Sequence, residues 1–187
     1  AAGEPVRAIF YYPWFPQTWH EDDQFTPSRG LYSNDSTEVL DAQFEDMAYA
    51  GLDLAISSWW GHGTVTGNRL ERVMKAGEAH GVGVVPYYEK EHGDQDPTVA
   101  ELRSDLAGLD PLTSRPGWLH VDGKPVIFVY NSGATGCSDV SRWRQATDGW
   151  TDFYVNLKVF PGFADCADQP QSWHQYGPST SRSVPVM

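Results

Sequence analysis

The chain has 187 residues, of which 40% are hydrophobic and 13% aromatic; this is enough apolar material for one domain with a sizeable core, and too much for a disordered chain. Its formal net charge of −12 makes the phosphate backbone of a nucleic acid an unfavourable partner. No apolar run approaches the roughly 20 residues that cross a bilayer, so neither a nucleic-acid partner nor a membrane span is predicted.

The chain opens with the pattern of a strand, a long loop and a helix. Residues 6–12 predict a buried strand, and residues 13–33 form a loop rich in turn formers and acids, long enough to suggest a function. A helical apolar stripe follows. We expect Asp35 to be its N-cap with Glu38 as the capping-box partner, and Gly51 to end the helix.

Strand and helix patterns keep alternating along the rest of the chain. In order, we expect strand 52–58, a helix capped by Asn68 and Glu71 and ended by Gly81, strand 82–87, a helix opened by Asp96-Pro97, a hairpin over 118–130 that turns at Asp122-Gly123, a helix capped by Ser138, and strand 153–159. After Phe160 the composition shifts to Gly, Pro, Asp, Gln and Ser, and no further helix is predicted.

Alternation of five core strands with four helices predicts parallel strands joined by right-handed crossovers. A doubly wound sheet usually has a Gly-rich phosphate loop after its first strand, whereas this chain has Tyr-Pro-Trp-Phe-Pro at residues 12–16. A (β/α)8 barrel of the TIM type fits better, although such barrels take about 250 residues. We therefore predict a single domain, residues 1–187, with an incomplete barrel of about five strand–helix units, either a fragment of a longer barrel or an unusual open form.

The two cysteines, Cys137 and Cys166, each lie among loop-forming residues. Two loop cysteines without a CxxC motif favour one disulfide and a secreted, extracellular protein, with two unpaired thiols as the alternative. No His or Cys pair has the spacing of a zinc site, and we predict no metal and no cofactor.

Aromatic residues crowd the ends of three predicted strands, beside His or carboxylate residues. The endings are Tyr11-Tyr12-Pro13-Trp14, Trp59-Trp60-Gly61-His62 and Tyr87-Tyr88-Glu89-Lys90-Glu91. Because the carboxyl ends of parallel strands meet at one face, we expect Trp14, Trp59, Tyr88 and Glu89 to border a common hollow. Flat rings stack on the C–H faces of a sugar while carboxylates bind its hydroxyls or transfer protons, so an oligo- or polysaccharide partner is predicted. The alternative is that the aromatics are core residues.

Glu89 and Glu91 are the predicted catalytic carboxylates, because side chains at i and i+2 of an extended segment share a side. Repulsion between them would raise the pKa of one, which suits a general acid beside an ionised partner; the alternative is a solvated turn. The predicted sugar-contacting residues are Tyr11, Tyr12, Trp14, Trp19, His20, Trp59, Trp60, His62, Tyr87, Tyr88, Asn131 and Lys158.

Several of these segments admit a second interpretation. His62 lies between glycines and either binds a hydroxyl or belongs to a structural turn. We expect the segment Trp19-His20-Glu21-Asp22-Asp23 to form an aromatic lid over bound sugar, with a calcium clip as the alternative for its acids. His92 with Asp94 and Asp96 is a metal candidate, although helix capping explains Asp96. Residues 173–176 line a distal subsite or pack the tail.

The motifs Phe10-Tyr11-Tyr12-Pro13-Trp14, Ala50-Gly51-Leu52-Asp53 and Ser57-Ser58-Trp59-Trp60-Gly61, with Tyr88-Glu89 and Asp122–Val126, resemble the N-terminal half of glycoside hydrolase family 99. This family comprises the endo-α-mannosidases and endo-α-mannanases, with bacterial 99-like proteins. The resemblance implies a (β/α)8 barrel, secreted or luminal, that cleaves internal α-mannosidic bonds with retention and without an obligatory metal.

The resemblance does not extend to the family's catalytic stretch. That stretch reads like Glu-Trp-His-Glu-Gly, whereas the nearest string here, Ser172-Trp173-His174-Gln175-Tyr176, has no acid at either place. The family's catalytic roles are therefore not assigned to it. The sequence predicts a glycoside hydrolase that cleaves internal bonds of a polysaccharide or glycan, with an α-mannoside among the candidates; the alternative is a non-catalytic carbohydrate-binding domain.

Overall fold

The computed structural model describes residues 5–20, 23–90, 96–130 and 135–177. Strands and helices alternate along it. The strands are β1 (Ala8–Tyr11), β2 (Leu54–Trp59), β3 (Gly83–Tyr88), β4 (His120–Val121), β5 (Lys124–Val129), β6 (Tyr154–Lys158) and β7 (Ser172–His174). The helices are α1 (Thr37–Tyr49), α2 (Val65–His80), α3 (Val99–Leu109) and α4 (Cys137–Thr147), with 3₁₀ turns η1 (Asp110–Leu112) and η2 (Phe163–Asp165).

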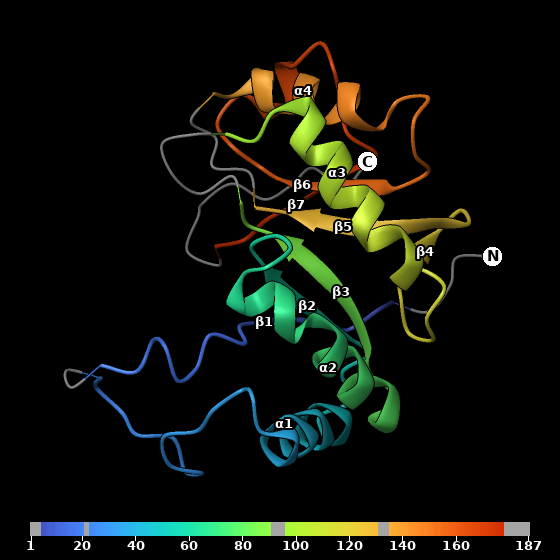
Figure 1. Cartoon of the computed structure of the whole chain (residues 1–187). Helices are drawn as coiled ribbons and strands as arrows, with labels where there is room; N and C mark the ends of the chain where they lie inside the picture. Colours follow the sequence, from blue (N-terminus) through green and yellow to red (C-terminus); the bar gives the residue numbers. More distant parts are fainter. Residues whose placement is uncertain (1–4, 21–22, 91–95, 131–134, 178–187) are drawn as a thin grey trace.

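Six of the strands form one parallel sheet in the order β1-β2-β3-β5-β6-β7, and β4 pairs antiparallel with β5 through the predicted Asp122-Gly123 turn. The sheet curls into a half-barrel with the four helices outside it (Figure 1). The predicted alternation of parallel strands is confirmed, and so is an incomplete barrel-like α/β fold.

The register of the parallel strands keeps alternate side chains on the same face across the whole sheet. Ser58 pairs with Tyr87, Tyr87 pairs with Phe128, and Phe128 pairs with Asn156. Since successive residues of a strand point to opposite faces, these side chains and those two residues away share the concave side. We call this set the inner face: Phe10, Tyr12, Ser58, Tyr87, Glu89, Phe128, Tyr130, Asn156, Lys158, His174 and Tyr176.

The helix starts differ from those expected from the sequence. Ser36, not Asp35, caps α1 by accepting a hydrogen bond from the Val39 N–H. Thr64, not Asn68, caps α2 by accepting from the Gly67 N–H. In both cases the hydroxyl that caps is the one that reaches the third backbone N–H of the helix.

The later helices show the same shift. Thr98 and Glu101 form the capping box of α3, so Asp96 is not its cap. The α4 helix begins at Cys137, after Gly136, one residue before the predicted cap Ser138. Asp96 instead accepts a hydrogen bond from Arg142 at 3.4 Å.

Strand β7 was not predicted, because three residues within a Gly-, Pro- and Ser-rich tail carry no readable periodicity. It forms through parallel pairing with β6, where Lys158 lies opposite His174. The tail therefore adds a sixth parallel strand and brings His174 onto the inner face.

A disulfide joins Cys137 to Cys166, with a Cα–Cα distance of 5.3 Å, which confirms the predicted pairing. Cys137 is the first residue of α4 rather than a loop residue. The bond ties α4 to the η2 turn that leads into β7. Within the described residues, no helix is both long and apolar enough to cross a bilayer.

We expect removal of this disulfide to destabilise the fold. The bond closes a loop with a sequence separation of 29 residues, and the chain-entropy relation gives about 3.5 kcal/mol for a loop of that length. Urea unfolding should show a loss of that order when the protein is reduced with dithiothreitol. The double variant Cys137→Ser, Cys166→Ser is the control: its unfolding midpoint should not respond to dithiothreitol, and a wild-type midpoint equally indifferent to it would contradict this role.

Candidate carbohydrate site

Glu89 follows β3 and lies on the inner face, where it is 5% exposed. Its backbone N–H donates to the Trp59 carbonyl at 3.0 Å, which extends the pairing of β2 and β3 by one residue. The Ser58 hydroxyl donates to its Oε2 at 2.5 Å. A buried carboxylate is thereby held in a fixed direction at the carboxyl end of the sheet.

Ser58 connects Glu89 to an indole ring. While its hydroxyl donates to Glu89, its oxygen accepts a hydrogen bond from Trp14 Nε1 at 2.8 Å. One hydroxyl thus orders an acid and an aromatic side chain that come from different strand ends. This is the pairing that a sugar site requires, since the ring offers a face and the acid offers an acceptor.

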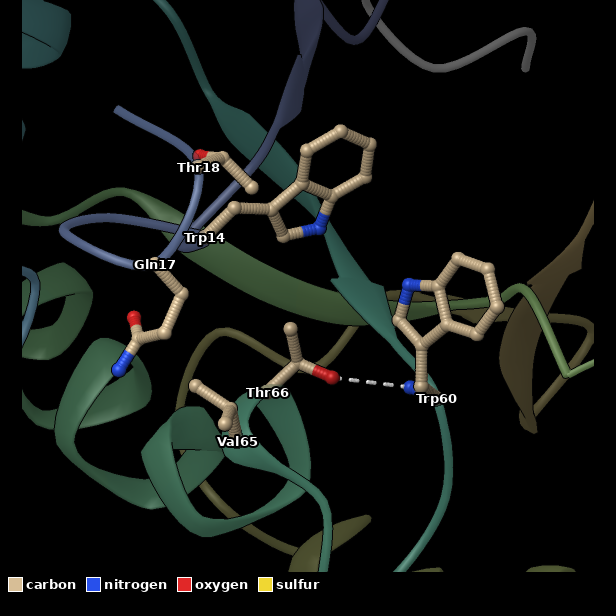
Figure 2. A pocket seen from close by; sticks show the side chains of 6 residues that line it. All are labelled: Trp14, Gln17, Thr18, Trp60, Val65 and Thr66. Carbon is tan, nitrogen blue, oxygen red and sulfur yellow. Dashed lines mark hydrogen bonds between the residues drawn. The ribbon is translucent and has the colours of Figure 1, made fainter. Parts of the chain in front are cut away.

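Trp14 and Trp60 face a hollow of about 320 Å³ at this end of the fold. We call it the rim hollow, and Figure 2 shows its lining: Trp14, Gln17, Thr18, Trp60, Val65 and Thr66. The Trp60 backbone N–H donates to Thr66 Oγ1 at 3.0 Å, which fixes the loop after β2 against the first turn of α2. Glu89 does not line the hollow; the Trp14–Ser58 contact links the two.

Arg69 of α2 holds the first loop in place, and its side chain is 1% exposed. It donates to the Asp35 carboxylate through Nε and Nη2 and to the Pro13 carbonyl through Nη1 at 2.8 Å. A further bond goes from Nη2 to Gln17 Oε1 at 3.0 Å. These hydrogen bonds, first of all those from Arg69, hold the pKa of Asp35 below its usual range. The same guanidinium therefore anchors the segment that carries Trp14.

His174 occupies the middle of the inner face. Its Nε2 lies 3.0 Å from the Tyr87 hydroxyl and its Nδ1 lies 2.8 Å from Asn156 Oδ1. Burial, and then the positive charge of Lys158, lower its pKa from 6.5 to about 3. The ring is therefore neutral at pH 7, so it accepts from Tyr87 and donates to Asn156.

Tyrosine hydroxyls and a lysine complete the inner face. The Tyr12 hydroxyl lies 2.6 Å from that of Tyr176, and Lys158 Nζ lies 3.5 Å from the centre of the Tyr130 ring. Burial raises the pKa of Tyr12 and Tyr87 well above its usual value, and the negative charge of Glu89 adds to this shift. Both hydroxyls are therefore protonated at neutral pH.

Trp59, Tyr88 and Tyr11 lie on the opposite, helix-facing side of the sheet. Trp59 is 1% exposed and packs against His62, while Tyr88 is fully buried, packs edge-on against Trp143 and donates to Asp105 at 2.8 Å. Tyr11 packs against α1. The expectation that Trp14, Trp59, Tyr88 and Glu89 border a common hollow is wrong. Trp14 lines the rim hollow and the other three do not, and Trp59 and Tyr88 face the helices because the pleat turns adjacent residues to opposite faces.

His62 packs the loop before α2 against α3. Its ring packs against Gly108 of α3, where a Cβ atom would lie 2.1 Å from its Nε2. Gly67 of α2 likewise leaves room for a neighbouring group, because a Cβ atom there would lie 2.1 Å from the Gly61 carbonyl oxygen. Gly108 and Gly67 thus permit the close approach of the His62 ring and of the Gly61 backbone to the helices, which favours the structural-turn interpretation.

Trp19 and His20 belong to the first loop, which extends away from the sheet (Figure 1). Trp19 stacks on Phe15 with ring centres 3.9 Å apart, and its Nε1 donates to the Tyr32 carbonyl at 2.8 Å. Its ring thus builds a small cluster inside the loop, and His20 is exposed beside it. The remaining candidates lie outside the described residues: Glu21, Asp22, Glu91, His92, Asp94 and Asn131.

Among the described residues no three His, Cys, Asp or Glu side chains gather as a metal site requires. Of the predicted site residues, the structure brings six to the inner face or the rim hollow: Tyr12, Trp14, Trp60, Tyr87, Glu89 and Lys158. Their contact with sugar stays a prediction.

Sequence reasoning overlooked Ser58, Tyr130, Asn156 and the anchor Arg69. The period of two along a strand could have found Ser58 and Asn156, since Ser58 lies two residues before Trp60 and Asn156 two before Lys158. No local signal marks Arg69, whose partners lie 34 to 56 residues away.

Comparison with solved structures shows which known proteins share this fold. Neither a family model nor a curated protein matches the sequence. Two solved structures of the family 99 endo-alpha-mannosidase from Bacteroides thetaiotaomicron superpose with TM-scores of 0.74 and 0.71, at 17% and 16% identity. The chain has the fold of glycoside hydrolase family 99. A structure described as a glycoside hydrolase-like protein gives a TM-score of 0.60 at 15% identity.

The similarity spans most of this chain and part of the others. It covers 94% of this chain but 60% and 62% of the two mannosidase chains, and 85% of this chain but 53% of the third. The chain therefore spans about three-fifths of the length of the mannosidase structures it matches. The resemblance read from the sequence motifs is confirmed at the level of the fold.

His174 makes the stability of the fold depend on pH. Its pKa is about 3 when folded, against an ordinary value of 6.5, so the unfolded state binds the proton first as the pH falls below 6.5. Between pH 6.5 and 3 this lowers the free energy of unfolding by up to about 1.4 kcal/mol per pH unit. We expect His174→Phe to lose that part of the slope in urea unfolding at pH 7 and pH 4.5, whereas His120→Gln, at an exposed site, keeps it. An unchanged slope in His174→Phe would show that the ring titrates normally.

Proposed function

We propose that this chain is a carbohydrate-active domain of the glycoside hydrolase type. It binds an oligo- or polysaccharide with its rings at the rim hollow and cleaves an internal glycosidic bond with Glu89 as the acid/base group. The observation that carries the proposal is the hydrogen-bonded connection Trp14–Ser58–Glu89, which joins a stacking surface to a buried carboxylate. The fold shared with endo-alpha-mannosidases makes α-mannosides the first substrates to test.

The environment of Glu89 suits proton transfer. The carboxyl group is 5% exposed and accepts a hydrogen bond from the Ser58 hydroxyl, so it is shielded from bulk water and held in one orientation. Conventional glycoside cleavage uses two carboxyl groups, one to protonate the leaving oxygen and one as nucleophile or base. We assign the second role to Glu91, two residues further along the chain.

The other groups of the inner face serve as hydroxyl partners. Tyr12 is half-buried and stays protonated at neutral pH, so its hydroxyl donates as well as accepts, whereas Tyr87 is fully buried and donates its hydrogen bond to His174. Lys158 supplies a positive charge 3.5 Å from the centre of the Tyr130 ring, and we assign it a hydroxyl- or leaving-oxygen-binding role. The disulfide between Cys137 and Cys166 is typical of exported proteins, and we propose an extracellular location on that ground.

A second candidate is a carbohydrate-binding domain without hydrolysis. Strand β7 favours this candidate. Its inward-facing positions hold Ser172 and His174, and Tyr176, two residues further on, is not an acid either. Among the described inner-face residues, Glu89 is the one carboxylate. Binding would then use the rings and Glu89 as an acceptor, with no bond cleaved.

Hydrolysis of α-mannan, followed as release of reducing ends, tests Glu89. If it transfers the proton, Glu89→Gln should lower the rate at least about 100-fold while sugar binding persists, since general acid–base catalysis contributes factors of about 10² to 10⁴. Glu45→Gln, on the exposed side of α1, should retain the wild-type rate. Binding without any product in the wild-type chain would establish the second candidate, and equal rates for Glu89→Gln and wild type would remove Glu89 from the mechanism.

Binding measured by affinity electrophoresis in a polysaccharide gel tests the rim hollow. Trp60→Ala removes a ring that faces the hollow, so we expect affinity to fall about tenfold, corresponding to about 1.4 kcal/mol of lost stacking and burial. Tyr49→Ala, at a side chain that is 95% exposed on α1, is the matched control. Retention of full affinity by Trp60→Ala would place the sugar elsewhere.

A further inference from the structure

A second hollow lies at the other end of the sheet. It has a volume of about 370 Å³ and is lined by Leu106, Ala107, Asp110, Trp150, Thr151 and Asp152. Residues 150–152 lead into the start of β6, and Asp110 follows the end of α3, whereas the rim hollow lies where β1 and β2 end. A strand of five residues rises about 16 Å, so one sugar ring cannot occupy both places.

Trp150 is the feature that marks this hollow. Its side chain is 44% exposed, although the neighbouring Phe153 is 1% exposed and fixes the segment in the core. The backbone N–H groups of Trp150 and Thr151 both donate to the Thr147 carbonyl, at 3.0 and 3.1 Å. The ring is therefore presented to solvent from a backbone that is already ordered, which lowers the entropy cost of binding to it.

The groups around Trp150 match the surface of a sugar. The ring offers an apolar face, and Asp110, Asp152 and Thr151 offer oxygen acceptors and a hydroxyl within the same hollow. Carboxylates that flank an aromatic ring accept hydrogen bonds from hydroxyls while the ring covers C–H groups.

A cationic ligand fits this hollow less well, even though the chain carries a net charge of −12. The Arg103 guanidinium already lies over the Trp150 ring, with its Cζ atom 5.6 Å from the ring centre. Its Nη2 donates to the Gln145 carbonyl at 2.8 Å, which keeps it there. This guanidinium occupies the cation position at the ring and offsets part of the charge of Asp110 and Asp152, so a second cation gains less there, whereas a neutral polyol needs no opposite charge.

We propose that the hollow around Trp150 is a second binding site for a neutral sugar chain, separate from Glu89 and the rim hollow. The proposal rests on the proposed function for the class of ligand. A polysaccharide held there gains affinity through a second point of attachment to the same molecule. Short oligosaccharides occupy the two sites independently.

Affinity electrophoresis of the full chain tests this second site, with gels containing α-mannan, β-glucan, xylan or starch. In at least one gel that retards the wild type, we expect Trp150→Ala to weaken binding about threefold to tenfold, the range for loss of one stacking ring. Trp60→Ala should weaken it separately, and the double variant should lose more than either. Tyr49→Ala should migrate as the wild type does.

The outcomes separate the two proposals. If Trp150→Ala migrates as the wild type in every gel that Trp60→Ala affects, the second site is overturned and the rim site stands. If no gel retards the wild type, both proposals fail. Binding should persist in 0.5 M NaCl, because a neutral ligand is not screened by salt; a Trp150-dependent ligand that salt releases, such as spermidine, would show that the hollow binds cations instead.

Discussion

The register between neighbouring parallel strands is the constraint on which this site depends. Ser58 lies opposite Tyr87, and Glu89 continues the same pairing through its N–H bond to Trp59. A shift of one residue would turn Glu89 toward the helices and bring Tyr88 inside. The sheet therefore decides which member of each aromatic pair lies on the inner face and which one packs against a helix.

The position of the first loop depends on a long-range ion pair between Arg69 and Asp35. Arg69 is buried and uses its guanidinium on Asp35, the Pro13 carbonyl and Gln17. A buried cation is tolerated only when paired and hydrogen-bonded, and these partners all lie between β1 and α1, in the segment that carries Trp14. The position of the Trp14 ring therefore depends on the packing of α2, and so do the rim hollow and the contact of Trp14 with Ser58.

Much of the fold and part of the site could be predicted from local patterns. The strand–helix alternation and the hairpin at Asp122-Gly123 were predictable because apolar periodicity and turn chemistry are local signals. Helix caps shifted by one to four residues, since several nearby hydroxyls and carboxylates compete for the same N–H groups. The sequence showed that aromatic residues cluster at the strand ends, but it did not show to which face of the sheet each ring turns.

The sequence alone determined that aromatic residues and an acid gather where parallel strands end, because residue order fixes which side chains come directly after each strand. Only the tertiary structure decided that Trp14 and Glu89 are joined through Ser58 while Trp59 and Tyr88 are buried under helices. It also recruited His174 from a tail without periodicity, through pairing with β6. These outcomes depend on contacts between residues 18 to 87 positions apart, which no local pattern encodes.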